Sequence, residues 1–176
     1  MPEEIEVPTE HLHESMEESA KEGGFNLRVA LSAALIAVLA AVCALFAGSY
    51  ANEAMLAQLK ASDQWSYYQA KSIKSAVLET KLDLLKAMGR KAAPKDLDKV
   101  AQYAKDMADI KTEATALAQK SEDLMVKHEL MAKGVTLFQV AIALSAIAAL
   151  TRRRFLWQAG LLLGAAGSVF LVMGLR

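Results

Sequence analysis

The sequence predicts an all-α integral membrane protein with three transmembrane helices and a long extramembrane antiparallel helical hairpin that resembles a coiled coil. Three apolar runs occupy residues 27–49, 134–150 and 155–175. The first and third are long enough to cross a hydrocarbon layer of about 30 Å at about 1.5 Å per helical residue. The second is near the lower length limit, and its helix can extend backwards through Leu130, Met131 and Ala132. Between the first and second runs, residues 50–133 are rich in charge and nearly free of helix breakers. This segment is therefore expected to form two long helices in water.

The composition narrows the class of function. Hydrophobic residues make up 54% of the chain and aromatic residues only 6%, so packing must rely on alanine and aliphatic side chains. Twenty basic and twenty acidic residues cancel, which leaves no net positive charge to attract a nucleic acid. The single cysteine, Cys43, lies inside an apolar run, so no disulfide framework is expected. We expect neither a cofactor nor a small-molecule substrate.

The first 26 residues are predicted to be an acidic, flexible segment. Eight acidic residues stand there against one basic residue, Lys21. His11 and His13 are two residues apart and would face different sides of a helix, so no metal site is expected. A long acidic leader is unlike the short basic start of a signal peptide, and the run that follows is expected to remain as a span.

The orientation in the membrane follows from one short loop. Residues 151–154 connect the second and third spans and contain Arg152, Arg153 and Arg154. Basic residues in short loops are retained in the cytoplasm. With three spans, the N-terminus is then cytoplasmic and residues 50–133 lie outside the cytoplasm.

The turn of the hairpin is predicted near residues 89–95. This stretch holds both Gly89, a suitable helix C-cap, and Pro94, which suits the first turn of a helix. Residues at spacings of three and four then form two facing stripes. The first stripe consists of Leu56, Leu59, Ser66, Ala70, Ile73, Val77, Thr80 and Leu84, and the second of Leu97, Val100, Ala104, Met107, Ala114, Leu117, Ser121 and Leu124.

The register between the two arms follows from the position of the turn. A turn centred near Ala92 sets Asp63 opposite Lys120, which matches their charges. The same register sets Leu84 opposite Val100.

An aromatic cluster marks the first arm of the hairpin. Three aromatic residues lie within four positions, and consecutive helical residues point about 100° apart, so at least one ring must face outward. Tryptophan and tyrosine are enriched at the centres of protein interfaces, which makes this segment a candidate interaction site. The alternative is that the rings fill a space between diverging helices. The candidate residues are Trp65, Tyr67, Tyr68, Gln69 and Lys71.

Small residues recur every three or four positions in two of the spans. Such stripes allow close packing of helices in lipid, and the sequence leaves open whether they pack within or between chains. The first span carries Ala30, Ala34, Ala37, Ala41, Ala44 and Gly48, and the third carries Gly160, Gly164, Gly167 and Ser168.

The interiors of the spans disfavour ion-coupled transport. Proton relays and pumps need ionisable groups at membrane depth, whereas these spans offer Gln139, Cys43 and a few hydroxyl groups. A pore lined by a ring of subunits remains open. No set of nucleophile, base and oxyanion donors is recognisable, so the protein is not expected to be an enzyme.

Several segments resemble one known family. These are the acidic leader, Tyr50 to Asn52 after the first span, residues 63–74 around the aromatic cluster, and the paired terminal spans. Together they resemble the uncharacterised bacterial membrane-protein family numbered 4337 among the domains of unknown function. The resemblance implies a bacterial membrane protein, supplies no catalytic residue, and favours a role for Trp65, Tyr68, Gln69 and Lys71 beyond filling space. With the orientation given by the arginine loop, we expect an inner-membrane protein whose hairpin is periplasmic or extracellular.

The function predicted from these features is a non-enzymatic inner-membrane protein that self-associates and acts as a scaffold or docking subunit through its hairpin. Its expected partners are the lipid bilayer and further copies of itself. Two alternatives are an oligomeric channel and an accessory subunit of a larger membrane complex. No nucleic-acid partner is expected.

Overall fold

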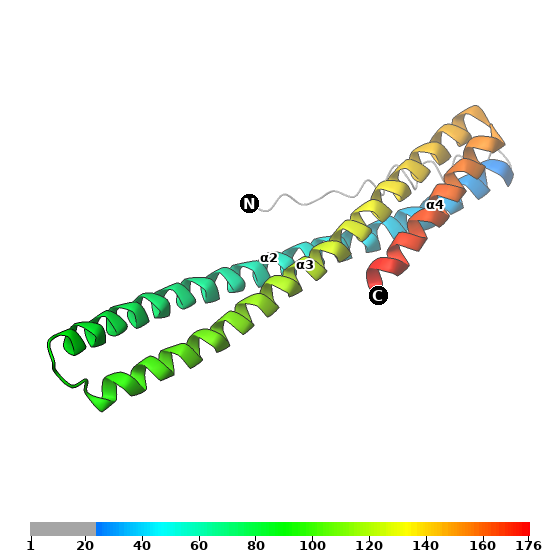
Figure 1. Ribbon diagram of the computed structural model, residues 1–176. Coiled ribbons are helices and arrows are strands. Elements are labelled where there is room, and N and C mark those ends of the chain that lie inside the picture. The colour runs from blue at the N-terminus through cyan, green and yellow to red at the C-terminus, as the bar shows by residue number, and fades with distance from the viewer. Residues whose placement is uncertain (1–23) are drawn as a thin grey trace, which may run out of the picture. The chain divides into compact units, whose positions relative to one another are not determined.

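The computed structural model describes residues 24–176, which form three long helices (Figure 1). These are α2 (Gly24–Ala87), α3 (Pro94–Thr151) and α4 (Arg154–Leu175). No strand occurs between Gly24 and Arg176, so the predicted all-α class is confirmed for this range. The predicted acidic segment with His11 and His13 lies outside the described residues, apart from its last three residues, which begin α2.

The chain divides into two compact units at Tyr50 and Val126. The three-helix unit contains residues 24–50 of α2, residues 126–151 of α3, and all of α4. The two-helix unit contains residues 51–125, and thus the rest of α2 and α3 with the turn between them.

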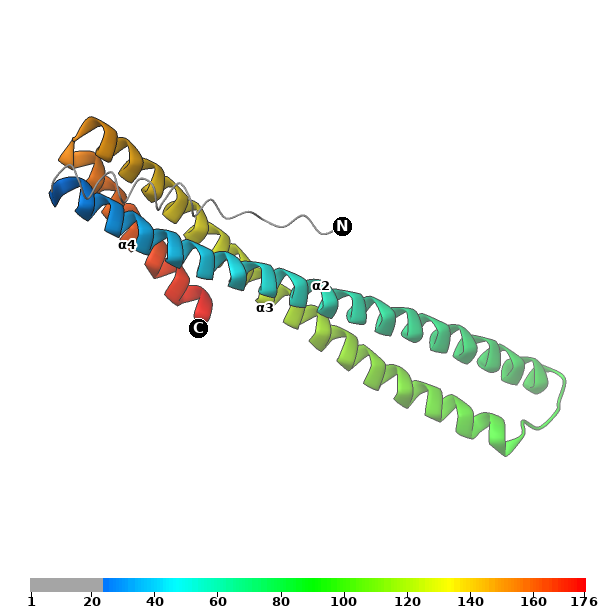
Figure 2. The same ribbon diagram turned by 180° about the vertical axis from the view of Figure 1, so that it is seen from behind.

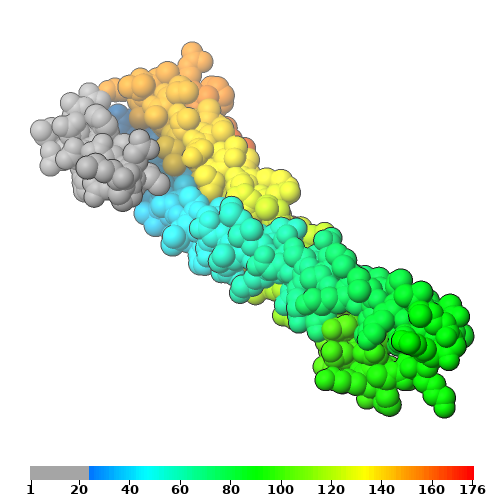
Figure 3. All heavy atoms as spheres, turned by 90° about the vertical axis from the view of Figure 1, so that its left-hand side faces the viewer, coloured from blue at the N-terminus to red at the C-terminus, as the bar shows by residue number. Residues whose placement is uncertain are grey.

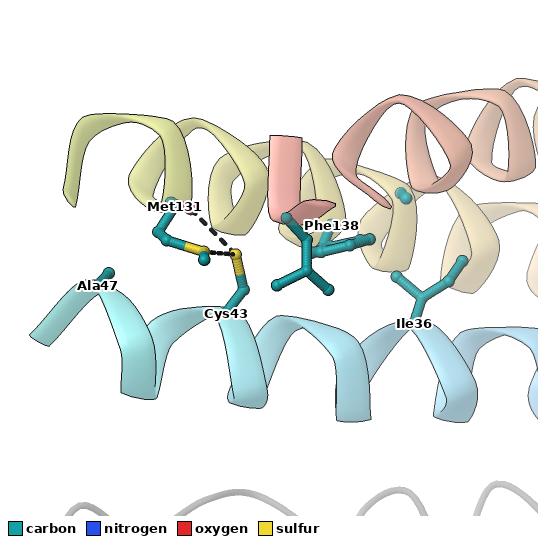
Figure 4. Packing of buried hydrophobic residues seen from close by; sticks show 7 residues of the cluster. Ile36, Cys43, Ala47, Met131 and Phe138 are labelled. Atoms are coloured by element: carbon teal, nitrogen blue, oxygen red, sulfur yellow. Dashed lines mark hydrogen bonds between the residues drawn. The ribbon is translucent and has the colours of Figure 1, made fainter. Parts of the chain in front are cut away.

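The core of the three-helix unit lies along positions spaced by three and four residues, as expected for helices packed side by side. Phe138 and Met131 are the largest fully buried side chains there. The thiol of Cys43 donates to the carbonyl oxygen of Met131, with 3.2 Å between sulfur and oxygen, and lies 3.5 Å from the Met131 sulfur (Figure 4). The buried cluster is Ile36, Cys43, Ala47, Met131, Phe138, Ala141 and Leu171.

Glycines on α4 provide the close contacts of this unit. Gly160, Gly164 and Gly167 are all buried. A Cβ atom on Gly164 would lie 3.0 Å from Cδ1 of Ile36, and one on Gly167 would lie 2.9 Å from Cε1 of Phe138. The glycine stripe therefore packs against α2 and α3 of the same chain, because only a missing side chain leaves room for those two residues.

The alanine stripe of the first span is placed differently. Ala34 and Ala37 are half-buried, and Ala41 is exposed. The buried positions of this part of α2 are instead Val29, Ala33, Ile36, Cys43 and Ala47. The alanine stripe thus lies beside the intramolecular contact, and its far end has no covering residue within the described chain.

The connection from α3 to α4 consists of Arg152 and Arg153, since Thr151 ends α3 and Arg154 begins α4. Arg152 has a positive φ of 52°, and Arg153 is extended at φ −93° and ψ 108°. Two residues thus reverse the chain where the sequence predicts a four-residue loop.

The turn between α2 and α3 has a Schellman motif at its start. Gly89 adopts a φ of 68°, a left-handed conformation in which a side chain is strained. Its N–H donates to the carbonyl of Lys86, and the N–H of Arg90 donates to the carbonyl of Leu85. Pro94 is the first residue of α3, where its missing N–H is not needed. The turn thus lies between Ala87 and Pro94.

Within the two-helix unit, α2 and α3 lie side by side in both views (Figures 1 and 2). Their facing positions follow a regular alternation of three and four residues, which is the spacing of a coiled-coil seam. The α2 side comprises the buried Ala54, Ala57, Ala61 and Ser75 and the half-buried Tyr68, Lys71, Leu78, Leu82 and Leu85. The α3 side comprises the buried Ile110, Ala114 and Ser121 and the half-buried Val100, Met107, Leu117 and Leu124.

The predicted first stripe is wrong, because α2 turns its small residues toward α3. The Ser121 hydroxyl donates to the carbonyl of Ala54 over 2.8 Å, a contact that requires the two helices to lie very close. Alanine and serine permit this approach, whereas leucine would hold the helices apart. The predicted residues Leu56, Leu59, Ser66, Ala70, Ile73, Val77, Thr80 and Leu84 are all exposed. The second stripe is correct except for Leu97 and Ala104, which are exposed.

The predicted register is also wrong, by about one heptad. Lys81 contacts Asp96 and Lys71 contacts Asp106, and the residue numbers of each pair add up to 177. The register expected from the charges of Asp63 and Lys120 is therefore not the one adopted.

Candidate interaction site on the two-helix unit

An ion pair links the two helices near the middle of the unit. Nζ of Lys71 lies 2.5 Å from Oδ2 of Asp106, and the two side chains are 15% and 30% exposed. Lysine is rarely buried without a partner, so this position on α2 depends on the carboxylate supplied by α3. Lys71 is one of the predicted interaction residues, and the structure turns it inward.

Two tyrosines flank the ammonium group of Lys71. Its Nζ lies 5.5 Å from the ring centre of Tyr67 and 5.1 Å from that of Tyr103. Both distances are within the range of cation–π attraction. The hydrogen bond to Asp106 raises the pKa of Lys71 above its usual value, and the negative charge of Asp106 acts in the same direction, while burial opposes it. The lysine is thus held in its charged form.

The other four predicted residues are Trp65, Tyr67, Tyr68 and Gln69, and they differ in exposure. The rings of Trp65 and Tyr68 meet edge to face, with 5.7 Å between their centres and 73° between their planes. Trp65 is 37% exposed and Tyr67 is 50% exposed, while Gln69 is also exposed. The five candidate residues therefore divide into an inward pair, Lys71 and Tyr68, and three residues that remain accessible.

Sequence reasoning missed the two α3 members of the cluster, Asp106 and Tyr103. Tyr103 is the one aromatic residue between Pro94 and Lys133, and it stands three residues before Asp106. That spacing places both on one side of a helix. The sequence signal that could have revealed them was an isolated aromatic residue followed by a carboxylate on the same side of the helix. Connecting these two residues with Lys71 required the register between α2 and α3.

A second ion pair lies close to the turn. Nζ of Lys81 is 2.6 Å from Oδ2 of Asp96, which stands in the first turn of α3. A carboxylate there is also favoured by the positive end of the helix dipole. Together with the hydroxyl of Ser121 on Ala54, these contacts join α2 to α3 at three levels of the unit.

The loop arginines adjoin an aromatic group in the three-helix unit. The guanidinium carbon of Arg154 lies 6.0 Å from the ring centre of Phe25, and Phe25 meets Trp157 edge to face at 5.9 Å. Nε1 of Trp157 donates to the hydroxyl of Ser32 over 3.0 Å. The N-terminal ends of α2 and α4 are thereby joined, and Arg152, Arg153 and Arg154 are all exposed.

The polar groups of the described chain offer no metal site, since residues 24–176 contain no cluster of three His, Cys, Asp or Glu side chains suited to a metal ion. The contacts around Lys71 fix the positions of the neighbouring aromatic side chains. Trp65 and Tyr67 are held on a helix whose register is set by ion pairs, and rigid, partly exposed aromatic side chains are suited to binding another protein.

Comparison with known proteins identifies a family over most of the chain. Residues 25–176 match the family model described as a domain of unknown function (DUF4337). No curated protein and no solved structure matches the chain. The match includes all three helices and the cluster around Lys71, and it confirms the resemblance seen in the sequence. The chain belongs to the DUF4337 family.

Proposed function

We propose that this chain is a non-enzymatic protein of the bacterial inner membrane that self-associates and acts as a scaffold or docking subunit through an extramembrane helical hairpin. The observation that carries the proposal is the division of the chain. Three helices are long and apolar enough to cross a membrane, while the two-helix unit carries ion pairs and charged exposed side chains. Long apolar helices are stable in lipid, whereas ion pairs and exposed charged side chains are stable in water.

Insertion of the three-helix unit is supported by its surface. Leu35, Leu45 and Leu162 are among many large apolar side chains that remain exposed there. A surface of this kind is unfavourable in water over so large an area, and the acyl chains of a bilayer would cover it.

The proposed topology places the N-terminal side of α2 in the cytoplasm and the hairpin in the periplasm or outside the cell. Its support is the exposed basic group of Arg152, Arg153 and Arg154 between α3 and α4. Short basic loops remain cytoplasmic because translocating them is unfavourable. The antiparallel arms would then stand outside the membrane with Trp65, Tyr67 and Gln69 accessible to partners.

Native mass spectrometry of the full chain, released gently from its own membrane, tests the self-association. A mass that is a multiple of 19.0 kDa supports the proposal. A single-chain mass contradicts it. A particle with a second polypeptide would instead identify the chain as an accessory subunit of a larger complex.

Cysteine labelling tests the topology. The chain has one cysteine, so a Cys43→Ala background carries no thiol. Ser62→Cys on the exposed surface of the two-helix unit should react in whole cells with a membrane-impermeant maleimide that reaches the periplasm, whereas Arg153→Cys should react only after the membrane is broken. The opposite pattern would invert the proposed orientation.

A pore is the second candidate, favoured by one polar residue. Gln139 lies within the apolar segment of α3 and is exposed on the three-helix unit. An amide facing lipid is unfavourable, and a ring of copies that turned it toward water would satisfy it. Conductance of the purified protein in planar bilayers, lost in Gln139→Leu, would support the pore. A silent bilayer at a defined protein density would leave the scaffold as the function.

A further inference from the structure

The outward side of α2 in the two-helix unit carries an apolar stripe that nothing in the described chain covers. We call it the outer stripe. Its five large side chains are between 57% and 66% exposed. Figure 3 shows this part of α2, coloured cyan to green, without any other described segment over it. The outer stripe consists of Leu56, Leu59, Ser66, Ala70, Ile73, Val77, Thr80 and Leu84.

The outer stripe faces away from α3. Leu59 stands two residues from both Ala57 and Ala61, which are buried against α3. Two residues correspond to a rotation of about 200° around a helix. The same offset separates Ile73 from the inward Lys71 and the buried Ser75. The helix therefore has apolar residues on two opposite sides, whereas a helix at the edge of a soluble hairpin needs only one.

The corresponding outward side of α3 is different in kind. Its positions hold charged residues, amides, hydroxyls and alanine, and no larger apolar side chain. They are Asp98, Ala101, Lys105, Ala108, Thr112, Ala116, Gln119 and Asp123, all of them exposed. This side is suited to water. The contrast shows that the outer stripe of α2 is a specific feature and not a general property of the unit.

We propose that a second copy of this chain covers the outer stripe, in a parallel α2–α2 contact in which each stripe residue meets its own counterpart. This inference deepens the proposed function and rests on it, since copies inserted in the same direction begin their extramembrane segments at the same height. Residues close to the membrane, such as Leu56 and Leu59, then lie level in the two copies.

The area of the outer stripe is sufficient for such a contact. Each of the large side chains Leu56, Leu59, Ile73, Val77 and Leu84 is more than half exposed. At roughly 100 Å² of apolar surface for each, two copies would remove about 1,000 Å² from water, which is near the lower limit for a specific interface. The heptad spacing of the stripe also allows the side chains of two helices to interlock on either side of Asp63.

The flanking charges select the parallel arrangement. If Leu56 and Leu59 are the a and d positions of a heptad, the e positions include Lys60 and Lys74, besides Lys81, which already pairs with Asp96. An antiparallel pair would bring these lysines against one another. A parallel pair instead sets each g position beside an e position of the second copy, so that Gln69 meets Lys74 without repulsion between like charges.

One residue that lies within the contact but outside the outer stripe opposes it. Asp63 occupies an a position between Leu56 and Ala70 and is exposed. In the parallel pair it would lie next to Asp63 of the second copy, and two facing carboxylates repel each other. Asp63→Leu should therefore raise the fraction of dimer. A strengthened contact cannot arise from a variant that merely unfolds.

Disulfide trapping in the full chain, held in lipid nanodiscs formed from native membranes, tests the proposal. In a Cys43→Ala background, Ile73→Cys should form a covalent dimer with copper phenanthroline as the oxidant, because equivalent residues meet in the parallel pair. Thr112→Cys on the outward side of α3 is the matched control and should give at least tenfold less dimer. Equal trapping at both sites, or none at Ile73→Cys and Val77→Cys, would overturn the contact.

The native mass separates failure of this inference from failure of the proposed function. A multiple of 19.0 kDa without trapping at Ile73→Cys would show self-association through another surface and would contradict only the α2–α2 contact. A single-chain mass would contradict both the α2–α2 contact and the proposed self-association. In the supporting case, Asp63→Leu raises the trapped fraction of Ile73→Cys at a given time of oxidation, and an unchanged or lower fraction counts against the parallel register.

Discussion

Nζ of Lys71 on α2 lies 2.5 Å from Oδ2 of Asp106 on α3, and the pair sits in a seam made mostly of small and aliphatic side chains. A charged pair in such a place contributes little net stability, because both groups lose water when they meet. Removing only one member leaves the other partly buried without a partner, which is the costlier change.

Changing both residues should therefore be milder than changing one. We expect Lys71→Met to lower the melting temperature of the full chain in detergent more than the exposed control Lys105→Met. The double variant Lys71→Met with Asp106→Leu should recover most of the loss. Thermal unfolding followed by circular dichroism measures all of these, and additive effects of the two substitutions would show that the pair is not coupled.

The raised pKa of Lys71 makes its contribution sensitive to alkali. Its stabilisation is fully present below the ordinary lysine pKa of 10.5 and is lost as the pH rises through the higher pKa of the folded protein. The gap in melting temperature between the native chain and Lys71→Met should stay constant between pH 8 and 10 and narrow only above about 10.5. A gap that narrowed already near neutral pH would contradict this assignment.

Gly167 should not tolerate even the smallest side chain. A Cβ atom there would lie 2.9 Å from Cε1 of Phe138, so Gly167→Ala must displace a fully buried ring. We expect a loss of about 1–3 kcal/mol, as for other overpacked cores. Gly48→Ala is the control, since no atom lies within 4 Å of its Cβ position. Reversible unfolding in mixed micelles compares the two, and equal stabilities would argue against the packing of α4.

Substitution of Gly89 should lower the stability of the chain because of its backbone conformation. Its φ of 68° is left-handed, and a Cβ atom there costs about 1 kcal/mol in an L-residue. Gly89→Ala should reduce the free energy of unfolding by this amount, while Gly89→Asn should have a smaller effect because asparagine adopts this conformation more readily. Urea unfolding measures the free energy of unfolding of both variants, and we expect a lower value for Gly89→Ala than for Gly89→Asn.

Local signals predicted much of the fold. The three apolar runs, the glycine at the end of α2 and the proline at the start of α3 each act through neighbouring residues, and the structure places helices and turn accordingly. The seam was mispredicted because Leu56, Leu59 and Ile73 have the size expected of core residues. Ala54, Ala57 and Ala61 form the contact instead, since close approach of backbones favours small side chains.

The register was ambiguous for an electrostatic reason. Lys71 faces Asp106, and in the expected register it would have faced Glu113, so either arrangement offers it a carboxylate. Lys81 distinguishes them, because it meets Asp96 in the structure and would have faced Tyr103 otherwise. The same ambiguity limited the prediction of the candidate site. Without the register, neither Tyr103 nor Asp106 could be connected with the aromatic cluster.

The three polar contacts between α2 and α3 within the two-helix unit also suggest an order in which the hairpin forms. They join residues 15, 35 and 67 positions apart, for Lys81 with Asp96, Lys71 with Asp106, and Ser121 with Ala54. Closing a short loop costs less chain entropy than closing a long one. We expect pairing to begin beside the turn and advance toward Ala54, which pulsed hydrogen exchange during refolding would reveal as earlier protection of the amides near Lys81. Each ion pair would then shorten the loop that remains to be closed by the next contact.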